Sequence, residues 1–259
     1  MREELYFWTV LVQFSKTYFD HLSDYVRAGK ETRKMECDCK VPFDPDEVAC
    51  GDSCLNRAMM IECGSRCKNS DRCTNKNFQK RKYANLDIFW TNGKGHGLKA
   101  LSPIKRGDFI IEYMGEVVSA KEFKKRSHEY SKAANKHHYF MELTKNATID
   151  ATQKGAISRF INHSCEPNAE TQKWTVNGLL RIGFFAIRDI EEGDEVTFDY
   201  QFIHFGAKGQ KCLCGASSCT GVIGRQAGVE EYRKKAGVKD ANIDYAKNIM
   251  SKFLKNHKA

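Results

Sequence analysis

Cysteine placement constrains this chain more than any other feature of its sequence. The chain has 11 cysteines, and seven of them fall in one window: Cys37, Cys39, Cys50, Cys54, Cys63, Cys67 and Cys73. Short spacings such as C-x-C and C-x3-C place two thiolates close enough to bind one metal ion, and zinc takes four such ligands in a tetrahedron. The window is polar with few long apolar runs, so a bound metal has to supply much of its folding free energy. The sequence therefore predicts a zinc-cysteine module here.

The number of cysteines in this window limits how zinc ions can share them. Two separate tetrahedral sites need eight ligands, whereas the window offers seven thiols and no histidine. Either one thiolate bridges two zinc ions, or one site takes a ligand from outside the window. Cys50 stands in the middle of the set and is the bridge that we predict. The alternative to zinc is a set of reactive or merely buried thiols.

A second cysteine group has three members, Cys212, Cys214 and Cys219, in the stretch CLCGASSC. A closed tetrahedral site needs a fourth ligand. Cys165 is the only cysteine outside both groups, so we predict that it completes a third zinc site. The alternative fourth ligand is His204 or water.

Cys165 lies in the stretch RFINHSCEPN, residues 159–168, two positions after His163. A cysteine beside a histidine also suits nucleophilic catalysis, as in a cysteine-dependent hydrolase. That interpretation leaves the three C-terminal cysteines without their fourth ligand. We therefore favour the zinc interpretation of Cys165.

The N-terminal sequence does not favour export. Its apolar stretch LYFWTVLVQF follows Glu3 and Glu4 instead of a basic region, is too short to span a bilayer, and precedes no small-residue cleavage site. Without export a disulfide framework is disfavoured, and metal binding becomes the expected use of the cysteines. Apolar residues at helical spacing between positions 11 and 25 instead predict an amphipathic helix that ends near Gly29.

The charge balance indicates the class of partner. The chain carries 42 Lys+Arg against 33 Asp+Glu, a net charge of +9. Such a balance suits a polyanionic partner such as chromatin, and a solvated basic surface is the alternative. A length of 259 residues and a hydrophobic content of 41% suit one large domain with small appended modules.

Residues 84–200 contain short strand patterns separated by turns. The strand candidates are LDIFW, FIIEYMGEVV, HYFMEL, ATIDA and LLRIGFFAI, and the first ends at Asn92-Gly93, a hairpin signal. Ser119 begins a predicted helix with Glu122 in capping-box position. The stretch AISRFI predicts a short helix or turn. With no βαβ rhythm and no repeat, the pattern predicts a β-rich α+β fold.

Four motifs together resemble the SET-domain protein lysine methyltransferases: GKGHGLKA, RFINHSCEPN, EEGDEVTFDY, and CLCGASSC followed by TGVIG. The first cysteine group is similar to the AWS (associated-with-SET) module and the last to the post-SET motif. The stretches DATQKG, AETQKWTVNG and FDYQF most resemble the Set2-type branch, which methylates lysine-36 of histone H3. The nuclear-receptor-binding SET and Ash1-type branches share the flanking zinc layout. The resemblance covers residues 35–224.

The resemblance implies a SET-domain fold of several small sheets with a threaded knot, flanked by AWS and post-SET zinc modules. The expected segments are an N-terminal helix (1–34), the AWS module (35–83), the SET domain (84–203), the post-SET motif (204–224) and a basic helical extension (225–259). Three structural zinc ions follow, two in the AWS module sharing Cys50 and one in the post-SET motif.

The same resemblance implies methyl transfer from S-adenosylmethionine to a lysine amine. Tyr200, which closes TFDY, would orient the amine and stabilise the developing charge, although taken alone it could be a core tyrosine. A phenylalanine at position 202 leaves room for several methyl groups, which favours di- or trimethylation. The implied walls of the lysine channel, with core packing as the alternative, are Phe140, Met141, Phe198 and Phe202.

The implied cofactor contacts come from four stretches of the chain. They are Lys94, Gly95, His96, His137, His138, Tyr139, Asn162, His163, Gln210 and Leu213. Asn162 and His163 could instead be buried structural residues, and zinc on the C-terminal cysteines would order a lid over the adenine. Two positions depart from the family. His96 replaces a large aromatic or apolar residue and His138 replaces the tyrosine usual in Set2-type relatives, so channel shape and product state stay open.

The implied partners are the histone H3 tail in the nucleosome and nucleosomal DNA, with nuclear chromatin as the location and no membrane partner. The alternatives are a catalytically weak, zinc-stabilised chromatin-binding module and a SET methyltransferase for another histone lysine. Intact Tyr200, Asn162 and His163 favour the enzyme. The tail 225–259 is basic with apolar residues at helical spacing, which predicts a helix; the alternatives for this helix are packing on the core, contact with nucleosomal DNA, or neither.

Overall fold

The structure of the protein is a computed structural model that describes residues 26–27, 35–44, 46–132, 139–201, 203–204 and 210–226. The chain divides into two compact units. Unit 1 comprises residues up to 91, 95–161 and 168–196, and unit 2 comprises residues 92–94, 162–167 and the chain from 197. The predicted N-terminal helix lies outside the described residues except at positions 26–27, which are not helical, since Arg27 forms an isolated β-bridge with Leu179. The predicted helix of the C-terminal extension lies outside them too, apart from Arg225–Gln226, which form a short strand.

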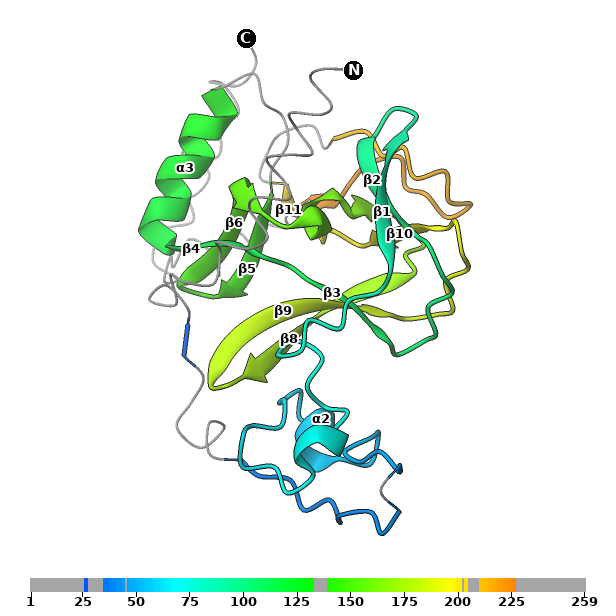
Figure 1. The fold of residues 1–259 in the computed structure, drawn as a ribbon. Helices are drawn as coiled ribbons and strands as arrows, with labels where there is room; N and C mark the ends of the chain where they lie inside the picture. Colours follow the sequence, from blue (N-terminus) through cyan, green and yellow to red (C-terminus); the bar gives the residue numbers. More distant parts are fainter. Residues whose placement is uncertain are drawn as a thin grey trace, which may run out of the picture. The chain divides into compact units, whose positions relative to one another are not determined.

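The cysteine-rich part of unit 1 has little regular structure (Figure 1). Its helices are the single turns α2 (Leu55–Ala58) and η3 (Ser70–Arg72). Among its described residues, one buried cluster consists of cysteine side chains and Ala49, so thiols take the place of much of an apolar core. This arrangement confirms that the window has no hydrophobic core of the usual kind.

The predicted hairpin at Asn92-Gly93 is confirmed. Strand β1 (Leu86–Thr91) pairs antiparallel with β2 (Gly95–Ala100), and Thr91 lies opposite Gly95 at the turn. Gly93 and Gly95 have φ angles of +96° and +79°, which explains why glycine occupies both turn positions. Strand β2 also pairs with the first half of β10 (Glu195–Phe198), through Glu195 and Val196.

A three-stranded antiparallel sheet carries the main aromatic core of unit 1. Its order is β3 (Phe109–Glu112), β9 (Leu179–Ala186), β8 (Ala169–Val176). The Phe78 and Phe109 rings pack in a tilted arrangement with centroids 4.4 Å apart, and Trp174 stacks on Phe185 at 5.5 Å. Buried aromatic pairs of this kind add to the free energy that burial alone provides.

The other sheet of unit 1 has the order β4 (Gly115–Ser119), β6 (Ala147–Gly155), β5 (Phe140–Thr144) and is accompanied by helix α3 (Ala120–Lys132). The Glu122 N–H donates to Ser119 Oγ at 3.2 Å, which confirms the predicted helix start. Arg126 joins the helix to the sheet through 2.9 Å hydrogen bonds to Glu116 and to the buried Asp150.

Two predictions about secondary structure need correction. The stretch FIIEYMGEVV is not one strand but divides into β3 and β4, which belong to different sheets. Tyr113 and Met114 separate the two strands, and β4 begins at Gly115, where a Cβ would lie 2.6 Å from the Asp150 carbonyl oxygen. Strands β8 and β10 were not expected, because their polar residues mask the strand pattern. The stretch AISRFI contains the 3-10 helix η4 (Ile157–Phe160).

Unit 2 contains a short parallel pair. Strand β7 (Asn162–His163) pairs with the second half of β10, so that Thr197 lies opposite Asn162 and Phe198 opposite His163. Strands β11 (Ile203–His204) and β12 (Arg225–Gln226) form a second parallel pair. The several small sheets confirm the predicted β-rich α+β class. The threaded knot stays a prediction. Within the described residues no helix meets the length and hydropathy that a membrane crossing requires.

Candidate active site and zinc centres

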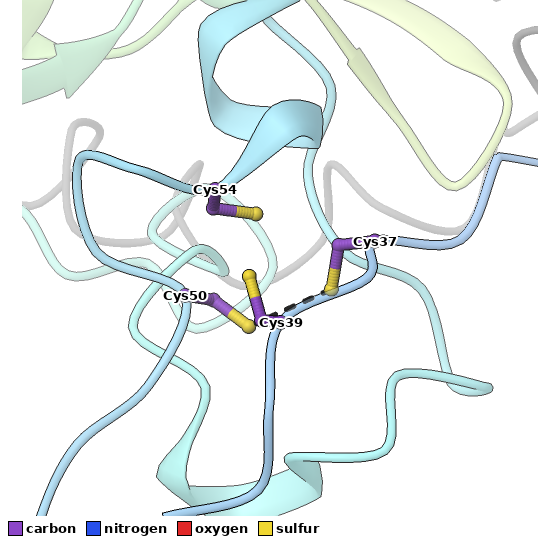
Figure 2. Close-up of side chains that lie close together, drawn as sticks. All are labelled: Cys37, Cys39, Cys50 and Cys54. Carbon is purple, nitrogen blue, oxygen red and sulfur yellow. Dashed lines mark hydrogen bonds between the residues drawn. The ribbon is translucent and has the colours of Figure 1, made fainter.

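The N-terminal cysteines form two overlapping quartets. Within each quartet the four sulfurs lie within 4.8 Å of one another: Cys37, Cys39, Cys50 and Cys54 in one, and Cys37, Cys50, Cys63 and Cys67 in the other. Figure 2 shows the first quartet, in which Cys37 and Cys39 come from one stretch of loop, Cys50 from a second and Cys54 from the start of α2, with their side chains pointing into a common centre.

The sulfur separations match a metal site and not a disulfide. The Cys37 and Cys50 sulfurs are 3.7 Å apart, as are those of Cys50 and Cys67, and the Cys37 and Cys67 sulfurs are 3.9 Å apart. A Zn–S bond of about 2.3 Å gives a tetrahedral edge of about 3.8 Å, whereas a disulfide bond is about 2.05 Å long. All 11 cysteines are free thiols, so the set is suited to hold zinc.

The C-terminal cysteines and Cys165 form a third quartet in unit 2. Cys165, Cys212, Cys214 and Cys219 all lie within 4.8 Å of one another. The Cys165 sulfur is 3.9 Å from that of Cys212 and 3.8 Å from that of Cys219, again the edge of a zinc tetrahedron. The structure thus brings together the four residues that cysteine counting selected.

Ionisation of this quartet requires a cation. Burial, reinforced by neighbouring thiols, raises the pKa of Cys212 to about 12. Burial also opposes ionisation of Cys214, but hydrogen bonds from the backbone of Cys165 and Ala216 outweigh it and lower its pKa to about 6. Four thiols this close cannot all become thiolates at neutral pH by themselves, whereas a bound dication deprotonates its thiol ligands.

Glu166 is a residue of this region that the sequence did not single out. Its Oε1 accepts a 2.9 Å hydrogen bond from Ser217 Oγ and a 3.0 Å hydrogen bond from the Ser218 N–H. The contact ties the residue after Cys165 to the loop between Cys214 and Cys219. Its position beside Cys165 was the available signal, because a ligand's sequence neighbour must lie close to the other ligands.

His163 connects this quartet to Tyr200. Its Nε2 lies 3.5 Å from the Cys165 sulfur, and its Nδ1 lies 3.2 Å from the Tyr200 backbone nitrogen. The imidazole is buried, and burial lowers its pKa below the ordinary value; the Asp199 carboxylate opposes this shift and the Lys94 ammonium adds to it. His163 is therefore neutral at pH 7.

The Cys165–His163 separation also bears on the hydrolase interpretation. A thiol 3.5 Å from an imidazole nitrogen meets one geometric requirement of a cysteine nucleophile. The same sulfur, however, has three other cysteines around it, and the second ring nitrogen is engaged by the backbone of Tyr200. Neither group is placed to serve as an exposed nucleophile and base.

The aromatic residues of EEGDEVTFDY cluster with His163 in unit 2. The Tyr200 ring lies 4.8 Å from the Phe198 ring and 5.4 Å from the His163 ring, measured between centroids. Tyr200, Phe198 and Asn162 are all partly buried, so each combines a fixed position with an accessible edge. An aromatic-lined site with one phenol hydroxyl is chemically suited to hold an alkyl amine.

The turn of the β1–β2 hairpin lies beside the C-terminal cysteine loop within unit 2. A Cβ on Gly93 would be 3.3 Å from Leu213 Cδ1, while a Cβ on Gly95 would have no atom within 4 Å. Leu213 is 46% exposed, which is unusual for a leucine in a fixed contact. Within unit 2, the exposed Leu213 side chain therefore lies against the turn at Gly93.

His96 sits in an aromatic environment in unit 1. Its ring lies 5.0 Å from Trp90, which is directly opposite in the β1–β2 register, and 5.5 Å from Phe160. Trp90 is 71% exposed and supplies aromatic surface beside His96. Sequence reasoning did not single out Trp90, although the register of the predicted hairpin would have placed it beside His96.

Strand β5 carries two of the predicted channel residues, Phe140 and Met141, which point to opposite faces. Phe140 packs against the α3 residues Phe123 and Tyr130, with ring centroids 4.9 Å and 5.8 Å away. Neighbouring residues of a strand point to opposite faces, so Met141 faces away from α3. Met141 is therefore the better candidate of the two for a channel wall.

Of the remaining predicted site residues, the structure describes Tyr139 and Gln210 but not His137, His138 and Phe202. Tyr139 precedes β5, and the Arg159 guanidinium lies over its ring at 4.1 Å. Gln210 is exposed, and its carbonyl accepts a 2.8 Å hydrogen bond from the Ile223 N–H within the C-terminal cysteine loop. His137, His138 and Phe202 lie outside the described residues, so their predicted roles stay predictions.

Family models match two regions of the chain. The SET domain model matches residues 95–201, and the AWS domain model matches residues 44–81. The first match contains Tyr200, Asn162, His163 and Cys165, and the second contains most of the N-terminal cysteines. The exact domain limits stay a prediction.

Curated proteins resemble most of the chain. The chain is 45% identical over 244 residues to histone-lysine N-methyltransferase SETD2 of Mus musculus, which covers 86% of this chain and 10% of that protein. It is 50% identical over 208 residues to histone-lysine N-methyltransferase Set2 of Drosophila melanogaster, covering 79% of this chain and 9% of that protein. The chain thus spans about a tenth of the length of these relatives.

A fungal protein and a solved structure extend the comparison. The H3 lysine-36 specific histone-lysine N-methyltransferase of Yarrowia lipolytica is 41% identical over 234 residues, covering 90% of this chain and 30% of that protein. The methyltransferase domain of human histone-lysine N-methyltransferase SETMAR superposes with a TM-score of 0.57 at 31% identity, covering 64% of this chain and 68% of that one. With its fold, its cysteine quartets and these similarities, the chain belongs to the SET-domain histone-lysine methyltransferase family and carries a match to the AWS domain.

Proposed function

We propose that this chain is an S-adenosylmethionine-dependent histone-lysine N-methyltransferase. The observation that carries the proposal is the placement of Tyr200. The tyrosine follows β10, its backbone is held by His163, and its ring packs with Phe198 at the edge of the β7–β10 pair. A phenol fixed in this way can orient an amine and stabilise charge that develops during transfer.

The chain's own residues suit S-adenosylmethionine, which supplies an electrophilic methyl group when bound. Open backbone at Gly95, the exposed Leu213 and the nearby Lys94 side chain lie at or beside the hairpin turn. Asn162 and His163 follow on β7, and we assign all five residues to cofactor binding, together with His96, His137, His138, Tyr139 and Gln210.

In our assignment Tyr200 binds the reacting lysine amine. The apolar side chains Phe198, Met141 and Phe202 line the channel for the substrate lysine. An apolar channel disfavours the protonated form of the substrate lysine, because burial destabilises a charged ammonium. The chain then needs no strong base of its own, since the amine enters neutral. Phe140 takes a lesser part, because its ring is engaged with α3.

We assign three structural zinc ions to the chain. The two N-terminal quartets share both Cys37 and Cys50 and together use six thiols, which leaves the buried Cys73 unused. Two tetrahedral ions use all seven thiols only when one thiolate bridges them. Cys50 is that bridge, since it belongs to both quartets and also forms a hydrogen bond with Cys73. The third ion takes Cys165, Cys212, Cys214 and Cys219.

The proposed substrate is lysine-36 of histone H3 in the nucleosome. Support comes from the Yarrowia lipolytica relative, which is named as specific for H3 lysine-36. A net charge of +9 suits nucleosomal DNA as a further contact, and chromatin in the nucleus as the place of action. The number of methyl groups follows from the channel, where Phe202 favours more than one.

A methyl-transfer assay tests the proposal. Tritium-labelled S-adenosylmethionine is incubated with recombinant nucleosomes and the protein, and label on histone H3 is counted. Matched nucleosomes with arginine at position 36 of histone H3 are the control. We expect label on the first substrate and background on the second. Equal labelling of both would overturn the lysine-36 assignment, and no labelling of either would overturn the methyltransferase assignment.

A further inference from the structure

We propose that the His163 side chain is a positioning residue that links the third zinc site to Tyr200. In this proposal its Nε2–H donates a hydrogen bond to the Cys165 sulfur, and its Nδ1 accepts the backbone N–H of Tyr200. The proposal rests on the proposed function only in giving Tyr200 its catalytic role. The link itself is a structural claim about the imidazole.

The hydrogen-bond partners define the tautomer. A backbone N–H is always a donor, so the nitrogen 3.2 Å from it, Nδ1, must be a bare acceptor. The single ring proton then lies on Nε2, which is 3.5 Å from the Cys165 sulfur. The Asp199 carboxylate lies 3.6 Å from Nδ1, beyond the range of a hydrogen bond, and does not compete for a proton there.

The backbone holds both partners in register. His163 lies opposite Phe198 in the parallel β7–β10 pair, and the Ser164 N–H donates to the Phe198 carbonyl at 3.0 Å. His163 is 6% exposed. These backbone contacts, made by Phe198 and Ser164, fix the position of its imidazole. The imidazole therefore bridges two segments that the backbone has already placed side by side.

The chemistry of the link follows from the donor set. An N–H group that donates to a metal-bound thiolate withdraws charge from sulfur and fixes the ligand's orientation. The Nδ1 atom of the same ring holds the backbone N–H of Tyr200 and so fixes the point from which the tyrosine side chain projects. Zinc occupancy and the position of the phenol are thus coupled through one side chain, with no contact between the metal and the substrate.

Two amide variants separate the hydrogen bonds of the two ring nitrogens. The amide of His163→Asn reaches only the Nδ1 position, so it can accept from Tyr200 but cannot reach Cys165. The amide of His163→Gln reaches the Nε2 position, so it can donate to Cys165 but leaves the Tyr200 N–H without its acceptor. Each variant is matched to the other in polarity and lacks the imidazole.

The first measurement uses the metal site alone and needs no catalytic activity. Zinc is replaced by cobalt, and the sulfur-to-cobalt charge-transfer band and the release of zinc to a chelator are recorded. For His163→Asn we expect a shifted band and roughly 10–100-fold weaker retention of one zinc. For His163→Gln we expect a band and a retention like those of the wild type. Wild-type behaviour of His163→Asn would overturn the proposal.

The second measurement separates kcat from the KM for S-adenosylmethionine. For His163→Gln we expect a lower kcat with full zinc content, which a purely structural role of the zinc site does not produce. If the wild type transfers no methyl group, the proposed function fails, while the cobalt result still decides the link. Nitrogen NMR of the wild-type imidazole decides it without any variant: a proton on Nε2 supports the proposal, and a proton on Nδ1 contradicts it.

Discussion

Leu213 lies directly over the hairpin turn at Gly93, with its Cδ1 atom 3.3 Å from the position that a glycine Cβ would occupy. The contact joins the loop of the C-terminal cysteines to the turn between β1 and β2. An exposed leucine held in this place is suited to cover a ligand at the turn. This placement of Leu213 leads to a prediction about the binding of S-adenosylmethionine.

Replacing Leu213 by alanine should weaken cofactor binding and leave chemistry unchanged. The loss of a few buried methyl and methylene groups predicts a KM for S-adenosylmethionine about 3–10-fold higher, with kcat unchanged. Steady-state kinetics at saturating nucleosome measures both. Val222→Ala, a 38% exposed residue of the same loop, is the matched control and should change neither constant. An unchanged KM for Leu213→Ala would remove Leu213 from the cofactor site.

Metal content tests the zinc assignment. The wild type should contain three zinc ions per chain by metal analysis, and Cys165→Ala should contain two, because a site with three ligands no longer closes. Ser217→Ala, which alters the same loop without removing a thiol, should keep three. Retention of three ions by Cys165→Ala would contradict the assignment of Cys165.

Stability tests the aromatic core of unit 1. A Cβ on Gly183 would lie 2.5 Å from Phe78 Cζ and 2.7 Å from Phe109 Cε2, so Gly183→Ala forces the two rings apart. Overpacking of this kind costs about 1–3 kcal/mol of the free energy of unfolding, measured by urea denaturation. The control is Gly64→Ala, since no atom lies within 4 Å of its Cβ position. Equal free energies of unfolding for Gly183→Ala and Gly64→Ala would show that the added methyl group does not destabilise the core.

A buried carboxyl predicts a pH dependence of stability. Burial raises the pKa of Glu112 to about 7, although the Arg181 guanidinium 3.4 Å away opposes the shift. Its folded pKa lies above its unfolded value, so the stability that it contributes is complete below about pH 4.5 and is lost as pH rises through 7. The full change is roughly 3 kcal/mol. Burial also raises the pKa of Glu62 and adds to the same trend.

Denaturation at pH 5.5 and pH 8 measures this effect. Wild type should lose stability between the two values, and Glu112→Gln should lose clearly less, because the amide does not titrate. Glu170→Gln, an exposed control, should follow the wild type. The same slope in wild type and Glu112→Gln would show that Glu112 is not the titrating group.

Local patterns predicted much of this architecture. The Asn92-Gly93 signal located the β1–β2 hairpin, and Ser119 with Glu122 located the start of α3. Cysteine counting selected Cys165 as the partner of residues about fifty positions away, because tetrahedral coordination fixes the number of ligands. These features could be predicted because each depends on a short motif or on a stoichiometric rule.

Other features depend on tertiary contacts that no local pattern encodes. The need for glycine at position 115, where β4 begins, follows from the approach of the Asp150 backbone, 35 positions further along the chain. The engagement of Phe140 with α3 depends on which face of β5 meets the helix. The link between His163 and Tyr200 arises from a parallel strand pair that joins distant segments. Sequence alone therefore suggested these residues without showing how they meet.

The central claim is that Tyr200 carries the methyl transfer, and Tyr200→Phe tests it most directly. The variant removes one oxygen and keeps the ring that packs on Phe198 and His163. The decisive measurement is the rate of label transfer from S-adenosylmethionine to histone H3 in nucleosomes, with cofactor affinity measured in parallel by equilibrium binding. We predict a rate about 100–1000-fold lower with unchanged affinity. A variant that transfers methyl groups at the wild-type rate would contradict the account.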